Sequence, residues 1–161
     1  MSEKIKKRKI MLVGTGFVGM SFAYSMLSEK GIDELVLVDV NEDKAKGEQM
    51  DLNDGLVYAD TKMKISAGSY ADAADTNIVV LTAGAAQKPT RLDLVKINAN
   101  ITKGVCKALK ENNFNGILVV ANNPVDIMTY VAWKESGLPK NHVIGSGTVL
   151  DTARLRHALS E

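Results

Sequence analysis

The sequence contains very little cysteine and histidine, and its positive and negative charges nearly cancel. Its single cysteine, Cys106, cannot form a disulfide within the chain, and two histidines are too few for a metal cluster of the usual spacing. Lys and Arg number 20 and Asp and Glu number 19, so the net charge of +1 gives no overall field to attract nucleic acid or an anionic membrane. We therefore expect no metal, no nucleic-acid or membrane partner, and a reducing cytoplasmic location.

The sequence also lacks internal repeats, low-complexity stretches and any linker that would divide it. Its 161 residues, 45% apolar and 24% charged, have the size and composition of one globular domain. We predict a single domain over residues 1–161, with residues 1–8 as a basic lead-in. This lead-in and the uncharged run at residues 10–28 imitate an export signal or membrane span. Gly14, Gly16 and Gly19 argue against both, because glycine weakens a helix, and no small-residue cleavage site precedes Glu29.

Short apolar runs alternate with helix-length segments along the chain. The runs cover residues 9–13, 34–39, 78–82, 117–121 and 143–145, with a weaker alternating run at 62–66. Their continuous hydrophobicity is typical of parallel strands that helices cover on both faces. The pattern predicts a doubly wound α/β domain built on one parallel sheet.

Two of the intervening segments carry apolar stripes at helical spacing. We interpret both as the core-facing sides of helices. Further helices are expected at residues 42–54 and 126–136, and a last one near Asp151, whose side chain would cap it. The first stripe comprises Val18, Phe22 and Met26, and the second comprises Leu94, Ile97, Ile101, Val105 and Ala108.

Gly14, Gly16 and Gly19 form a G-x-G-x-x-G motif between the first apolar run and the first helix. There the first glycine permits a tight turn, the second lets the backbone approach a pyrophosphate, and the third lets helix and strand pack closely. Asp39 ends the second run, twenty residues after Gly19, where a carboxylate accepts hydrogen bonds from the adenosine ribose. No arginine directly follows Asp39 to receive a 2′-phosphate. The motif predicts a Rossmann domain that binds NAD rather than NADP; the alternative is a Rossmann-like scaffold without a nucleotide, in which Asp39 caps a helix.

Three further stretches resemble the L-lactate and malate dehydrogenase family. They are TAGAAQKPTRLDL at residues 82–94, ANNPVD at 121–126 and GSGTVLDTAR at 145–154, and the resemblance extends over residues 9–161. It implies hydride exchange between NADH and the carbonyl of a small 2-oxo acid, in a protein that usually forms a homo-oligomer. Gln87 stands where malate enzymes of the family carry an arginine for the second carboxylate of oxaloacetate. The resemblance therefore favours pyruvate and lactate as substrates.

The resemblance also implies roles for single residues. Arg154 would clamp the substrate carboxylate, and Arg91 would stabilise the charge that develops on the carbonyl oxygen. Asn123 would hold that oxygen and the nicotinamide edge, and Asp151 would orient a catalytic histidine. Each has an ordinary structural explanation too, such as a surface arginine or a turn asparagine. The residues expected to bind the cofactor are Gly14, Gly16, Val18, Gly19, Asp39, Lys44, Tyr70, Gly84, Ala85 and Asn123.

The sequence departs from the family pattern in two places. A Gly-Glu pair that relatives usually carry between Pro89 and Thr90 is missing, which shortens the reach of the loop by up to roughly 7 Å and affects the approach of Arg91. The family's Gly-Glu-His-Gly stretch, with the proton-donating histidine, is not found, and neither His142 nor His157 has that context. We therefore expect the second, catalytic domain to be absent and this chain alone to be nearly inactive.

The resemblance also implies a regulatory role for Arg156. Many bacterial relatives use an arginine there to grip fructose 1,6-bisphosphate between subunits, and the alternative is a solvated arginine on a surface helix. Three functions stay open: the NAD-binding half of an L-lactate dehydrogenase, an NAD-binding module without turnover, and a protein with malate dehydrogenase-like specificity.

Overall fold

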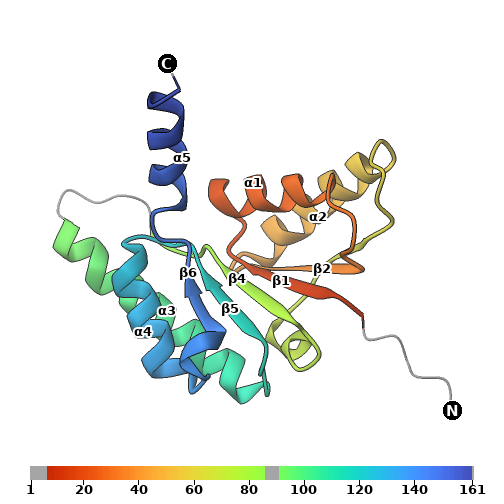
Figure 1. Cartoon of the computed structure of the whole chain (residues 1–161). Helices are drawn as coiled ribbons and strands as arrows, with labels where there is room; N and C mark the ends of the chain where they lie inside the picture. The colour runs from red at the N-terminus through yellow and green to blue at the C-terminus, as the bar shows by residue number, and fades with distance from the viewer. Residues whose placement is uncertain (1–6, 86–90, 161) are drawn as a thin grey trace, which may run out of the picture.

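The computed structural model describes residues 7–85 and 91–160 (Figure 1). The strands within these residues are β1 Lys9–Val13, β2 Glu34–Val38, β3 Lys64–Ala67, β4 Ile78–Leu81, β5 Ile117–Val120 and β6 Val143–Gly145. The α-helices are α1 Phe17–Met26, α2 Glu42–Leu56, α3 Arg91–Glu111, α4 Val125–Ser136 and α5 Val149–Ala158. Two short 3₁₀ helices, η1 Tyr70–Ala73 and η2 Lys140–His142, precede β4 and β6, respectively.

The strands pair in parallel in the order β3-β2-β1-β4-β5-β6. From β1 the chain builds outward through β2 and β3, then crosses to the other side of β1 and continues through β4, β5 and β6. The reversal leaves a crevice between the carboxyl ends of β1 and β4, which is where such sheets bind dinucleotides. The predicted doubly wound parallel sheet is confirmed. Five of the predicted runs each contain one of its strands, and the weaker run at residues 62–66 overlaps β3, which continues to Ala67.

Packed cores lie on both faces of the sheet. Successive strand residues point to opposite faces, so each strand can contribute to both cores. On one face Leu81 belongs to a core that includes Leu109 of α3 and Met128 of α4. On the other face Leu12 packs in a core with Leu52 of α2. Figure 1 shows α1 and α2 on one side of the sheet and α3 and α4 on the other. Each fully buried leucine contributes about 1.5–3 kcal/mol to this packing.

The apolar stripe predicted for α1 is wrong at its first residue. Val18 is 60% exposed, whereas Gly19 and Ala23 are the buried residues of the helix. Gly19 packs against the turn that follows β1, where even a Cβ would collide with the carbonyl oxygen of Gly14. Because successive helix residues are rotated by about 100°, this close approach turns Val18 away from the sheet.

The buried side of α3 also differs from the predicted stripe. Asn98 and Thr102 are 2% and 0% exposed, whereas Leu94 and Ile97 are only half-buried. Hydrogen bonds to loops and to another side chain satisfy the two buried polar groups, so their burial costs little. Apolar periodicity cannot predict a buried helix face that contains polar residues such as Asn98 and Thr102.

Helix α5 stands away from the sheet in Figure 1 and has no buried residue. Thr148 is its N-cap residue, and Asp151 lies inside the first turn. The prediction that Asp151 caps the helix is therefore wrong, since a capping side chain belongs to the residue before the first turn. Leu150 and Leu155 are each 60% exposed. None of the described helices, α5 included, is long and apolar enough to cross a membrane.

Candidate functional site

The turn between β1 and α1 requires glycine at two positions. Gly14 has a φ of +101°, and a Cβ there would lie 2.6 Å from the backbone nitrogen of Ala83, just after β4. At Gly19 a Cβ would collide with the Gly14 carbonyl oxygen and lie 2.8 Å from the Thr82 hydroxyl. That hydroxyl donates a hydrogen bond to the same Gly14 oxygen. The turn is thus held tightly against the ends of β1 and β4.

Gly16, between these two positions, faces open space. A Cβ there would meet nothing within 4 Å, and Gly16 is the N-cap residue of α1, without a side-chain cap or an acidic residue in the first turn. The first N–H groups of α1 and the positive end of its dipole are therefore available to an anion. The backbone at Gly16 fits the pyrophosphate of a dinucleotide.

Asp39 follows β2 and is bound to the same turn. Its Oδ2 accepts hydrogen bonds from the backbone N–H and the hydroxyl of buried Thr15, at 2.7 and 3.0 Å, and its Oδ1 accepts one from the Asn41 N–H at 3.0 Å. Burial opposes the ionisation of Asp39, but these hydrogen bonds and the charge of Lys44 outweigh it, so the pKa of Asp39 lies below its ordinary value. A charged carboxylate is therefore fixed beside the glycine turn.

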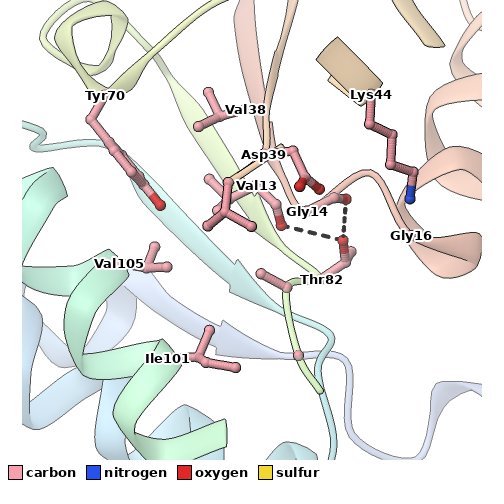
Figure 2. Close-up of a pocket in the computed structure, with 13 residues that line it drawn as sticks. Val13, Gly14, Gly16, Val38, Asp39, Lys44, Tyr70, Thr82, Ile101 and Val105 are labelled. Carbon is pink, nitrogen blue, oxygen red and sulfur yellow. Dashed lines mark hydrogen bonds between the residues drawn. The ribbon is translucent and has the colours of Figure 1, made fainter. Parts of the chain in front are cut away.

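A groove of about 360 Å³ lies over this edge of the sheet. Figure 2 shows Ile101 and Val105 of α3 across the groove from Asp39 and Lys44. Burial, together with the nearby Cys106 and Asp39, raises the pKa of Tyr70 above its ordinary value. The lining residues are Val13, Gly14, Gly16, Val38, Asp39, Val40, Lys44, Tyr70, Thr82, Ala83, Gly84, Ile101 and Val105.

The residues predicted to bind the cofactor fall into two groups. Gly19 is buried behind the turn, Val18 is exposed at the start of α1, the Ala85 N–H donates to Asn98, and the Asn123 side chain is exposed. The structure brings the remaining six together in the lining of the groove: Gly14, Gly16, Asp39, Lys44, Tyr70 and Gly84.

The cofactor residues predicted from the sequence do not include the apolar walls of the groove. Val13 and Val38 are the last residues of β1 and β2, where the carboxyl ends of parallel strands meet a ligand. The apolar stripe predicts Ile101 and Val105 as core residues of α3, and their side chains also border the groove. The positions of Val13 and Val38 at strand ends are a sequence signal for the groove, whereas the sequence gives no signal for the second role of Ile101 and Val105.

Among the residues predicted for the substrate end, those whose side chains the structure describes do not line the groove. Asp151 and Arg154 pair with each other on α5, with 3.4 Å between Arg154 Nη1 and Asp151 Oδ1, and their side chains are 69% and 70% exposed. Arg156 is exposed in the last turn of the same helix. Gln87 and the side chain of Arg91 lie outside the described residues. The structure thus places Asp151 and Arg154 together, but not with the groove-lining residues.

Other reactive groups in the described part of the chain offer no second centre. No three or more His, Cys, Asp or Glu residues there are grouped to hold a metal ion. Burial raises the pKa of Cys106 to about 12, so its thiol is not a nucleophile at neutral pH. The ring nitrogen Nδ1 of His142 lies 3.2 Å from the carbonyl oxygen of Gly116, and His142 does not line the groove. The groove is therefore the candidate site.

Comparison with known proteins identifies relatives of this chain. Residues 8–145 match a family model described as the lactate/malate dehydrogenase NAD-binding domain. The L-lactate dehydrogenase of Macrococcus caseolyticus is 53% identical over 161 residues, 99% of this chain and 51% of that protein. The L-lactate dehydrogenase of Halalkalibacterium halodurans is 56% identical over 158 residues, 97% of this chain and 51% of that protein. The chain thus spans about half the length of the curated relatives it matches.

A solved structure agrees with this relationship. The minor L-lactate dehydrogenase from Enterococcus mundtii, in its ligands-bound form, superposes with a TM-score of 0.93 at 51% identity. The match covers 96% of this chain and 50% of that one. The sheet and helices described above are therefore arranged as in half of that structure.

Proposed function

We propose, since this chain belongs to the lactate/malate dehydrogenase family and forms its NAD-binding domain, that it is the cofactor-binding half of an NAD-dependent L-lactate dehydrogenase. The observation that carries the proposal is the Asp39 carboxylate, which the glycine turn holds in the same groove as the open backbone of Gly16. These two features suit the two ends of an adenosine diphosphate group. The identity of 53–56% to L-lactate dehydrogenases supports the assignment within the family.

At the adenosine end, Asp39 would accept hydrogen bonds from the ribose hydroxyls and the Gly16 backbone would bind the pyrophosphate. The fixed negative charge of Asp39 would repel a 2′-phosphate and thereby select NAD over NADP. Val38, Ile101 and Val105 provide apolar surface for the adenine ring. Lys44 and Tyr70 line the same end and would complete the cofactor site.

At the substrate end, NADH would supply the hydride for reduction of a 2-oxo acid. Arg154 would bind the substrate carboxylate through its planar guanidinium fork. Arg91 and Asn123 would stabilise the carbonyl oxygen as negative charge develops on it, and Asp151 would orient a histidine. Neutral Gln87 would leave the second carboxylate of oxaloacetate unpaired, which favours pyruvate.

We expect little pyruvate reduction by this chain alone, because proton donation by a positioned group is worth about 10² to 10⁴ in rate and His142 lies away from the groove. Homo-oligomer formation and a cytoplasmic location also remain predictions from the sequence.

The proposal is tested by joining this chain to the second half of the Macrococcus caseolyticus enzyme and following NADH oxidation. We expect kcat/KM for pyruvate to exceed that for oxaloacetate by about tenfold or more. Gln87→Arg should reverse the preference, whereas the neutral control Gln87→Met should keep it. A preference of the unmodified chimaera for oxaloacetate would show malate specificity instead. NADH binding without consumption of either substrate would indicate a binding module.

A further inference from the structure

Two buried asparagine side chains connect the loops that follow β4 and β5. Asn98, on α3, is 2% exposed, and Asn122, just after β5, is 4% exposed. Neither lines the groove, and neither has a role in the proposed function. Most buried polar groups are hydrogen-bonded, because an unpaired one is costly, so the partners of these amides show which segments they connect.

Asn98 holds two loops with one planar amide group. Its Oδ1 accepts a hydrogen bond from the Ala85 N–H at 2.8 Å, and its Nδ2 donates to the Asn123 carbonyl oxygen at 2.6 Å. Gly84 packs against the same amide, since a Cβ there would lie 3.4 Å from Asn98 Oδ1. The backbone from Gly84 to Ala85 and the peptide of Asn123 are therefore placed relative to each other by a single side chain.

Asn122 makes a second connection between the same loops. Its Nδ2 donates to the Ala83 carbonyl oxygen at 2.9 Å and to the Thr102 hydroxyl at 3.1 Å. Its Oδ1 is buried and makes no hydrogen bond within the described part of the chain. Asn122 also bonds α3 through Thr102, so it resembles a structural cross-link, whereas both partners of Asn98 are loop backbone.

The loops after β4 and β5, which Asn98 connects, lie at the end of the groove where a nicotinamide would bind. A dinucleotide lies across the crevice, one half on each side of the switch between β1 and β4. Asp39 and the glycine turn, which we propose for the adenosine half, lie on the β1–β2 side. The nicotinamide half would therefore lie at the carboxyl ends of β4, β5 and β6. Gly84 lines the groove there, and Asn123 follows β5.

We propose that Asn98 is a positioning residue for the nicotinamide end of the cofactor groove, which it shapes by fixing Gly84, Ala85 and Asn123. The inference rests on the proposed function, because it presumes that NADH occupies the groove. Asn98 acts through the loops and does not touch the cofactor. Loss of its amide leaves the adenosine end, which depends on Asp39 and the glycine turn, unchanged.

The test compares two ligands that differ only in the nicotinamide. NADH and ADP-ribose are titrated calorimetrically into the unmodified chain, Asn98→Ala and Asn98→Asp, and urea unfolding is measured for each. Asn98→Asp keeps an acceptor for the Ala85 N–H but removes the donor to Asn123, so it retains one connection if Asn98→Ala does not fold. Cys106→Ala is the matched control, because Cys106 is fully buried two turns further along α3 and its Sγ contacts the Ala132 carbonyl oxygen rather than either loop.

We expect the Asn98 variants to weaken NADH binding by about tenfold and ADP-ribose binding by less than about twofold, whereas Cys106→Ala leaves the ratio of the two constants unchanged. Equal weakening of both ligands, or of neither, in an Asn98 variant would overturn the inference and leave the proposed function standing. Failure of the unmodified chain to bind either ligand would overturn both.

Discussion

In the cofactor groove, Asp39 accepts hydrogen bonds from Thr15 and Asn41 and is held against the glycine turn, whereas on α5 the carboxylate of Asp151 pairs across one helical turn with Arg154. We propose roles for both aspartates in the same reaction. Two backbone N–H groups and one hydroxyl donate hydrogen bonds to Asp39. Asp151 belongs to an ion pair whose side chains are about 70% exposed, and such pairs contribute little to stability.

The residues proposed for the site differ in how the rest of the molecule holds them in place. Residues of the groove are placed by strand ends, by a turn that excludes side chains, and by a core that packs beneath them. Asp151 and Arg154 lie on α5, which has no buried residue, and Leu150 and Leu155 of the same helix are exposed. The described residues therefore suffice to shape a groove, whereas the side chains of Asp151 and Arg154 on α5 are largely exposed.

The largest contrast is expected in stability. Leu81→Ala empties a fully buried position at the end of β4 and should lower the free energy of unfolding by about 2–5 kcal/mol. Leu155→Ala, on exposed α5, should change it by less than about 0.5 kcal/mol. Urea denaturation of both variants measures the two effects. Similar losses would mean that α5 packs against the rest of the molecule.

Within the groove, two glycines should respond differently to the same added methyl group. Gly19→Ala should lower the free energy of unfolding by about 1–3 kcal/mol, because its Cβ collides with the Gly14 carbonyl. Gly16→Ala meets no atom within 4 Å and should leave the fold nearly as stable while it weakens NADH binding. Unfolding and NADH titration separate the outcomes. Tight NADH binding by Gly16→Ala would remove the pyrophosphate from this position.

The two aspartates can be compared by one substitution made at each. Asp39→Ser should weaken NADH binding by about tenfold or more, since it removes a charged acceptor for the ribose hydroxyls. Asp151→Ser, on α5, should leave NADH affinity within about twofold of the unmodified chain. Fluorescence titration with NADH measures both. Comparable losses at the two positions would place α5 against the cofactor.

The smallest expected effect is on the pH dependence of stability. Because the pKa of Asp39 in the folded chain lies below its ordinary value of 3.8, its ionised form stabilises the fold fully above that value, and this contribution is lost as the pH falls through the folded pKa. Asp39→Asn should therefore lose less stability on acidification from about pH 5 downward. Urea unfolding of both proteins over this pH range measures the difference. If the free energy of unfolding of Asp39→Asn falls with pH as steeply as that of the unmodified chain, Asp39 does not contribute to the pH dependence of stability.

The same contrast explains which features were predictable from the sequence. Continuous apolar runs predicted five of the six described strands, a weaker alternating run predicted β3, and the spacing from the glycine motif predicted that Asp39 lies beside the turn, because all of these depend on local chain geometry. The exposure of Val18 was not predictable, since it follows from the close approach of Gly19 to the turn. The burial of Asn98 was not predictable either, because an amide is buried only where two distant loops supply its partners. Nor does helical pattern alone show that α5 stands free of the sheet.

The central claim, that the described residues form a groove selective for NAD, is tested most directly by calorimetric titration of the unmodified chain with NADH and NADPH under identical conditions. We predict saturable binding of NADH at one site per chain and a dissociation constant for NADPH at least about tenfold higher, because the charge of Asp39 opposes the 2′-phosphate. Equal affinity for the two cofactors, or binding of neither, would contradict the account.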